Sequence, residues 1–289
     1  MVVAQRAVRL RRGAVIVALV SVSPLVPFLA GSSSAAPTVG SVYSYDLTGV
    51  TTTPVANGAE ANSAVRLSLF GAWAPSTVGV HFIGDKVSKR SVAFAKPASG
   101  PTLSAAASDA VGGAVKFRYE APTSGACFGD SHNVAQIGRF GSGLTQLKMQ
   151  LSSCAGSKTA VFTECRMVGA NSTNSDLPKR GTQALVNGAT YAVKCFKGPD
   201  PLTGQATLTL QTTKLDAVNG NVTTVNTFLI TRPGSMTSSQ YLSVANKYPL
   251  PGQRYNTDQF TGDVAKVAFC KTAAIDTLIA CLDTEVPES

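Results

Sequence analysis

The chain has 289 residues and a formal net charge of +9, and 44% of its residues are hydrophobic. Part of the positive charge lies in the first 12 residues, and the remainder forms no dense run with interleaved aromatic residues. A nucleic-acid partner is therefore not expected, because such binding usually needs a concentrated basic patch. The roughly 200 residues of the main part are enough for one sizeable core.

The first 35 residues have the three parts of an export signal. Residues 1–12 are basic, residues 13–30 form an apolar run, and small residues follow up to Ala35, after which cleavage is expected. A retained membrane anchor is the alternative, but the run is at the short limit for a span and contains two prolines. We expect a signal peptide over residues 1–35, a secreted or cell-envelope location, and no membrane insertion after cleavage.

All six cysteines follow this segment, and an even number of cysteines in an exported chain favours disulfide bonds. There is no Cys-x-x-Cys pair and there are only two histidines, so a zinc site is not expected. Spacing alone leaves the connectivity open. We favour a middle pair that joins two strands of one sheet face and a last pair that fastens the C-terminal tail. The favoured pairs are Cys127–Cys154, Cys165–Cys195 and Cys270–Cys281.

The N-terminal part after the signal, residues 36–112, is rich in Thr, Ser, Gly and Ala. It is predicted to be a strand-and-loop region that packs on the main domain, with edge strands at residues 46–47 and 65–70. Residues 95–113 contain Pro and Gly, are rich in Ala and end in Gly-Gly. They are predicted to be a loop, with a short helix at residues 103–111 as the alternative.

Strict alternation of apolar and polar residues begins at Val115 and predicts strands with one buried face. Residues 145–151 show it, with the odd-numbered side chains from Leu147 inward, and so do residues 191–195 and 206–210. Many short strands with frequent turns predict an all-β fold, an antiparallel two-sheet jelly-roll sandwich. The predicted core domain covers residues 113–270, and residues 271–289 form a tail tied by a disulfide.

Four segments have a more specific pattern. They are Gly129-Asp-Ser-His-Asn-Val-Ala-Gln-Ile-Gly-Arg139, Gln146-Leu-Lys-Met-Gln-Leu151, Cys165-Arg-Met-Val-Gly169 and Asp258-Gln-Phe-Thr-Gly262. Together they resemble successive strands of secreted actinobacterial laminin-G-like domains, over roughly residues 110–270. The resemblance implies a concanavalin A-like, laminin-G-like sandwich.

The chain departs from that family at two places. Thr190 and Tyr191 stand where a Trp and a His are usual, and Ala265 stands where an acidic residue is common. These departures weaken the transfer of a calcium or ligand site from the family. The Gln and Gly of the Asp258-Gln-Phe-Thr-Gly262 segment are interpreted instead as packing and turn residues.

Hydrolytic chemistry lacks the residues that it needs. Ser131 lies in a Gly-Asp-Ser block, but His132 is its direct neighbour and would point to the opposite face of a strand. A glycosidase needs two carboxylates facing each other across a cleft, and the acids between Cys127 and Tyr255 are isolated and predicted mostly in turns. We therefore expect no enzyme activity.

Two groups of residues remain as binding candidates. Calcium at the rim of a sandwich needs several oxygen ligands. The alternative is that the aspartates cap turns or face solvent. Aromatic residues on the loops of a rigid sandwich suit ligand contacts, although a lone Trp is more often a buried edge contact. The calcium candidates are Asp258, Asp263, Asn256 and Asp130, and the ligand candidates are Tyr241, Tyr248, Tyr255 and Trp73.

The sequence thus predicts a secreted or cell-surface, non-catalytic recognition module that binds a glycan or an extracellular protein through rim loops. The alternatives are a structural cell-envelope protein without a discrete ligand and a diverged glycoside hydrolase. A glycan array on the oxidised protein separates the first two.

Overall fold

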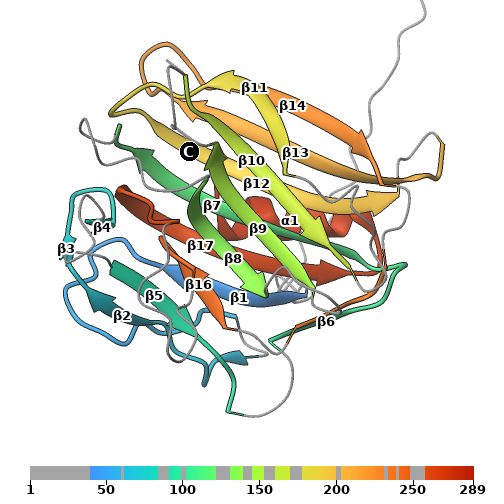
Figure 1. Cartoon of the computed structure of the whole chain (residues 1–289), viewed down its shortest axis with the longest axis horizontal. Coiled ribbons are helices and arrows are strands. Elements are labelled where there is room, and N and C mark those ends of the chain that lie inside the picture. The colour runs from blue at the N-terminus through green and yellow to red at the C-terminus, as the bar shows by residue number, and fades with distance from the viewer. Residues whose placement is uncertain are drawn as a thin grey trace, which may run out of the picture. The chain divides into compact units, whose positions relative to one another are not determined.

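Antiparallel strands in two facing sheets make up almost all of the described structure (Figure 1). The computed structural model describes residues 40–59, 62–83, 91–98, 102–121, 131–138, 145–152, 160–169, 178–199, 203–230, 234–238, 241–247 and 258–289. The predicted signal peptide lies outside these residues. So do Cys127, Cys154, Asp130, Asn256, Tyr248 and Tyr255.

The eight-stranded sheet joins segments from both ends of the chain. Its strands are β1 (Ser41–Asp46), β3 (Trp73–Pro75), β4 (Val80–Phe82), β7 (Ala110–Tyr119), β12 (Thr190–Pro199), β13 (Ala206–Leu215), β14 (Val222–Leu229) and β17 (Gly262–Thr272). They lie in the order β14-β13-β12-β7-β17-β4-β3, and β1 also pairs with β17.

The seven-stranded sheet lies in front of it in Figure 1. Its strands are β2 (Ser68–Gly71), β5 (Ser91–Ala95), β8 (Ser131–Gly138), β9 (Gln146–Ser152), β10 (Phe162–Val168), β11 (Lys179–Ala184) and β16 (Leu242–Val244). Their order is β11-β10-β9-β8-β16-β5-β2. A separate two-stranded sheet pairs β6 (Leu103–Ala105) with β15 (Met236–Ser238).

The hydrophobic core lies between the two large sheets and confirms the predicted all-β, antiparallel, two-sheet fold. In β7, Val115, Phe117 and Tyr119 are buried, whereas Lys116 and Arg118 are partly exposed. This is the alternation predicted from the sequence, and it follows from the period of two along a strand. The predicted N-terminal region supplies strands to both sheets, since β2 and β5 belong to one and β1, β3 and β4 to the other.

The prediction of a loop over residues 95–113 is wrong, and so is the alternative of a short helix, because β6 and the start of β7 lie there. Gly112 and Gly113 are in the middle of a strand and not in a turn. A Cβ added to Gly112 would lie 2.6 Å from the Cβ of Phe196, and one added to Gly113 would lie 2.8 Å from Cε1 of Phe269. Neighbouring side chains fill this space, so the glycines permit close packing on both faces of the strand.

The C-terminal tail contains a helix that the sequence patterns did not predict. This helix, α1 (Ile275–Glu285), packs on the outer face of the eight-stranded sheet (Figure 1). Leu278 and Leu282 are buried against Ala114 and Phe196. Within the described part of the chain, no helix is long and apolar enough to cross a membrane.

Two of the three favoured disulfides lie in the described residues, and both are present. Cys270 of β17 is bonded to Cys281 of α1, which fastens the tail as expected. Cys165 of β10 is bonded to Cys195 of β12. The expectation that this middle pair joins strands of one sheet face is wrong, because β10 and β12 belong to different sheets. The bond therefore crosses the core and links the two layers.

Candidate functional site: an aromatic and polar face of the seven-stranded sheet

A row of outward-facing side chains crosses the seven-stranded sheet. The register pairs Phe94 of β5 with Ser243 of β16, and Ser243 with Gln136 of β8. It continues from Gln136 to Lys148 of β9 and from Lys148 to Arg166 of β10. The residues on either side of each one along its strand belong to the core, so this row lies on the outer face. The face thus changes from aromatic to polar to basic across the strands.

Three aromatic residues gather at the β2–β5 side of this face, and we call them the aromatic cluster: Phe70, Phe94 and Tyr241. The rings of Phe70 and Phe94 are stacked with centroids 4.6 Å apart, and Phe94 meets Tyr241 edge-on at 5.4 Å. Phe70 is 48% exposed, although a large aromatic side chain is normally mostly buried. The ammonium of Lys96 lies 5.3 Å from the ring centroid of Tyr241. The cluster is therefore a partly exposed aromatic surface, with Phe70 its exposed member and a cation over the ring of Tyr241.

The two described aromatic candidates from the sequence do not come together. Tyr241 belongs to the aromatic cluster, directly before β16. Trp73 lies on β3 at the edge of the other sheet, where it is partly buried and packs against the core. This is the structural role weighed for it from the sequence. Phe70 and Phe94 were missed, although each is an outward apolar residue in a short alternating segment, which is the signal that could have identified them.

The middle of the row is buried. The sequence predicted that residues 145–151 would be buried on one face only, but the structure buries both faces. Every residue of β9 is buried, and Lys148 is 3% exposed. Its Nζ lies 2.9 Å from Oδ2 of Asp258, an oxygen that also forms an ion pair with Lys247. An ion pair lowers the cost of burying these charges, which explains how a lysine can face this covered position.

The electrostatics of this pair are set by burial and by mutual attraction. Burial lowers the pKa of Lys148 to about 8, and the attraction of Asp258 opposes part of that shift. Burial alone would raise the pKa of Asp258, but Lys148 and Lys247 together hold the pKa below its ordinary value. Asp258 is therefore ionised at neutral pH, and its carboxylate is engaged by two ammonium groups.

The Asp258-Gln-Phe-Thr-Gly262 segment fixes the strands beneath this face. The side chain of Gln259 makes four hydrogen bonds: it accepts from the Ser91 N–H and the Asn246 amide and donates to the carbonyls of Ala245 and Phe260. Gly262 has φ +136, where a Cβ would lie 2.5 Å from the carbonyl oxygen of Arg118. These contacts confirm the packing and turn roles interpreted from the sequence.

The predicted calcium candidates are separated in the described residues. Asp258 pairs with two lysines, whereas Asp263 lies on β17 beside His81 and Arg118. Asp263 is 1% exposed, so the alternative that it faces solvent is wrong. No group of three or more His, Cys, Asp or Glu side chains within the described residues is arranged to hold a metal ion. With Asn256 and Asp130 outside those residues, the four-residue calcium site remains a prediction.

Some of the other buried polar groups near the row have hydrogen-bond partners, and others have none in the described structure. The acids between Cys127 and Tyr255 were predicted to lie mostly in turns, but one of them, Glu164, is buried in β10. Its carboxylate accepts hydrogen bonds from Gln150 at 2.7 Å and Arg180 at 2.9 Å. The side-chain oxygens of Ser243 and Gln136 are buried without a hydrogen-bond partner in the described structure. A buried acceptor of this kind is normally met by water or by a ligand.

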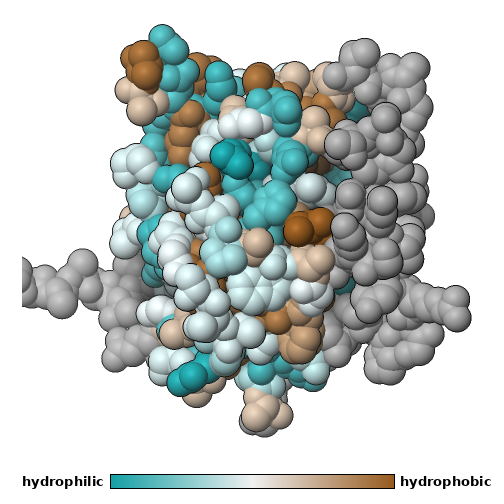
Figure 2. Space-filling view, turned by 90° about the vertical axis from the view of Figure 1, so that its left-hand side faces the viewer, coloured by the Kyte–Doolittle hydropathy of each residue, from teal (hydrophilic) through white to brown (hydrophobic). Residues whose placement is uncertain are grey.

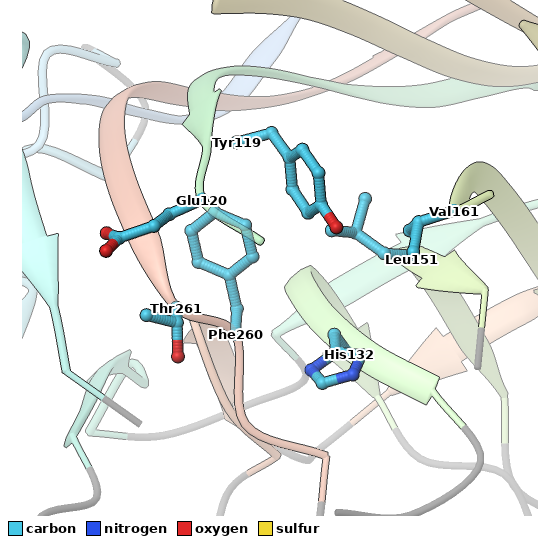
Figure 3. Close-up of a pocket in the computed structure, with 7 residues that line it drawn as sticks. All are labelled: Tyr119, Glu120, His132, Leu151, Val161, Phe260 and Thr261. Atoms are coloured by element: carbon cyan, nitrogen blue, oxygen red, sulfur yellow. The ribbon is translucent and has the colours of Figure 1, made fainter. Parts of the chain in front are cut away.

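A small cavity lies at one end of the sandwich, where residues of both sheets line it. It has a volume of about 10 Å³ and is lined by Tyr119, Glu120, His132, Leu151, Val161, Phe260 and Thr261 (Figure 3). The space is at the lower limit for a single water molecule. His132, one of the residues of the Gly-Asp-Ser-His block, is buried there, and its Nδ1 lies 2.5 Å from the carbonyl oxygen of Gln259. Burial lowers the pKa of His132.

No protein-family model and no curated protein matches this chain by sequence. Solved structures with a similar arrangement include the binding domain of botulinum neurotoxin serotype G (6% identity over 85% of this chain and 50% of that chain, TM-score 0.46). They also include a SAP-like pentraxin from Limulus polyphemus (6% identity, 86% and 83% covered, TM-score 0.36). A third is the winged bean acidic lectin complexed with methyl-α-D-galactose (12% identity, 80% and 97% covered, TM-score 0.36).

The chain spans about half the length of the botulinum neurotoxin binding domains that it resembles. Because the TM-scores are below 0.5, none of the similarities assigns a ligand or a role to particular residues.

Proposed function

We propose that this protein is a secreted, non-catalytic module that binds a glycan on the outer face of the seven-stranded sheet, at the aromatic cluster. The single observation that carries the proposal is the exposure of Phe70 on a cluster of three packed rings. An exposed aromatic surface on rigid strands commonly marks an interaction site. The two disulfides support secretion, since such bonds persist in oxidising compartments.

The chemistry of the cluster suits a sugar ring. The face of an aromatic ring carries negative charge density and attracts polarised C–H groups, which a pyranose presents on its apolar side. Lys96, whose ammonium lies over the ring of Tyr241, can donate to hydroxyl or carboxylate oxygens. The buried oxygens of Ser243 and Gln136 lie next along the row and accept hydrogen bonds, so a bridging water can connect them to a bound polyol. On this proposal the ligand binds to the strands of the sheet, whereas the sequence predicted binding through the rim loops.

Replacing Phe70 with Ala tests the proposal in the oxidised protein against a panel of neutral and acidic polysaccharides. We expect about a tenfold loss of affinity for the glycan that binds, because truncating an aromatic anchor typically costs more than ~1 kcal/mol. Isothermal titration calorimetry gives the measurement. Phe70→Leu should lose nearly as much, because it keeps an apolar side chain but removes the ring.

Leu229→Ala is the matched control, because Leu229 is 66% exposed on β14, at the far edge of the other sheet. It should leave glycan affinity unchanged. Failure of every glycan to bind the wild-type protein, or equal affinity of the wild type and Phe70→Ala, contradicts the proposal. If Leu229→Ala weakens binding as much as Phe70→Ala does, the binding site lies elsewhere.

A further inference from the structure

A second group of polar side chains lies on the eight-stranded sheet, on strands β4, β17 and β7. The register places His81 of β4 opposite Asp263 of β17, and Asp263 opposite Arg118 of β7. Oδ1 of the buried Asp263 lies 2.8 Å from Nδ1 of His81, and Oδ2 lies 2.8 Å from Nε of Arg118. The second contact is an ion pair without hydrogen-bond geometry. Asp263 therefore holds the imidazole ring in a fixed orientation.

This contact determines which nitrogen of His81 carries the proton. A carboxylate only accepts hydrogen bonds, so Nδ1 is the donor and Nε2 keeps its lone pair in the neutral ring. Nε2 points to the other side, where Oε2 of Glu120 lies 3.7 Å away. A lone pair and a carboxylate oxygen repel each other at this separation. A positive charge between these two atoms, such as a metal ion, would make the contact favourable.

We propose that His81 Nε2 and the Glu120 carboxylate bind a divalent transition-metal ion of the Zn²⁺ type. An imidazole nitrogen with a carboxylate oxygen is a donor set that such ions accept. An imidazole whose other N–H donates to a carboxylate is the usual arrangement around a bound metal. Among the described side chains that contact His81 or Asp263, the two carboxylates of Asp263 and Glu120 stand against one permanent cation, Arg118, and this balance favours a bound cation.

The two ligand side chains are accessible. His81 is 26% exposed and Glu120 is 49% exposed. Figure 3 shows the carboxylate of Glu120 pointing away from the small cavity and from His132. Strands β3 and β4 lie at the left of Figure 1, and hydrophilic residues gather in the upper middle of that side in Figure 2. With two protein ligands, the remaining coordination positions are left to water or to a donor on a binding partner.

The chain has only two histidines, which allows a direct test. The oxidised protein without a histidine tag is labelled with ¹⁵N, and its imidazole resonances are followed by NMR during titration with ZnCl₂. We expect the Nε2 resonance of His81 to shift on saturation while Nδ1 stays protonated, with His132 unaffected because it is buried and pairs with a carbonyl. Absence of a His81 shift at millimolar Zn²⁺ overturns the proposal.

Variants distinguish coordination of Zn²⁺ by the two ligand side chains from a general effect of negative charge on Zn²⁺ binding. Glu120→Gln should weaken Zn²⁺ binding about tenfold or more, and Asp263→Asn, which removes the orienting group, should cost about 10–100-fold. Asp276→Asn is the matched control, since it removes one negative charge from the first turn of α1. Circular dichroism confirms that each variant is folded. Equal weakening by Glu120→Gln and Asp276→Asn would show non-specific attraction and overturn the site.

Discussion

Replacing Asp258 with Asn is expected to destabilise the fold by about 3–5 kcal/mol, because it leaves a buried lysine without its carboxylate. Lys148 is 3% exposed and lies 2.9 Å from the carboxylate oxygen that the substitution neutralises. The attraction of Asp258 is also what keeps the pKa of Lys148 from falling further. Urea unfolding followed by circular dichroism measures the loss of unfolding free energy.

The Lys148–Asp258 pair also makes the unfolding free energy depend on pH. Burial lowers the pKa of Lys148 from 10.5 to about 8, so between these values the unfolded chain holds a proton that the folded chain has released. The contribution of Lys148 to stability therefore increases as the pH rises through that window. In Asp258→Asn the folded pKa falls further. The difference in unfolding free energy between wild type and variant should thus be largest below the folded pKa of Lys148 in the variant and should shrink as the pH rises towards about 8.

Asp258 affects the unfolding free energy at acid pH. Its folded pKa lies below the ordinary value of 3.8, so its contribution is complete above that value and is lost as the pH falls through the folded pKa. Asp258→Asn should remove this part of the acid unfolding profile.

A double variant tests whether the loss comes from the unpaired ammonium. Lys148→Met combined with Asp258→Asn should be more stable than Asp258→Asn alone, because no buried charge remains at that position. A double variant that is as unstable as the sum of the two single variants would mean that the two side chains act independently. A loss below about 1 kcal/mol for Asp258→Asn would show that the burial of Lys148 is relieved by other means.

The strands could be predicted from the sequence wherever buried and exposed side chains alternate along them. Val115, Phe117 and Tyr119 face the core as their spacing predicted, because β7 is polar on its other side over this stretch. The same rule failed at Gly112 and Gly113, where two glycines looked like a turn. Their role depends on Phe196 and Phe269, which contact them from opposite faces of the sheet. A single sequence does not reveal that contact.

The candidate sites were less predictable, because their residues meet through pairings between distant strands. His81 and Asp263 are 182 residues apart in the chain, and only the alignment of β4 with β17 brings them together. The aromatic cluster likewise needs β2, β5 and β16 to be neighbours in the sheet. Tyr241 could be selected from its residue type and Phe70 and Phe94 from their outward positions, but only the strand order shows that the three lie together. Lys148 was assigned to an open face because its partner Asp258 is 110 positions away.

Removing the disulfide that crosses the core should have the second large effect. Cys165→Ala with Cys195→Ala opens a loop with a sequence separation of 30. Chain-entropy arguments give a loss of about 3–4 kcal/mol for a loop of this length. In a domain of this size, each kcal/mol lowers Tm by about 2–4 °C, so scanning calorimetry should show a decrease of roughly 6–16 °C. Unchanged Tm in the double variant, or in the wild type under reducing conditions, contradicts this role.

The matched control is the other described disulfide, removed by Cys270→Ala with Cys281→Ala. Its loop is shorter, with a sequence separation of 11, so the expected loss is about 3 kcal/mol or less. The two variants should also differ in where the structure loosens. Hydrogen exchange should increase across β10 and β12 in the first variant, because these strands then hold the two sheets together by packing alone. In the control it should increase mainly in α1, because Cys270–Cys281 ties that helix to β17.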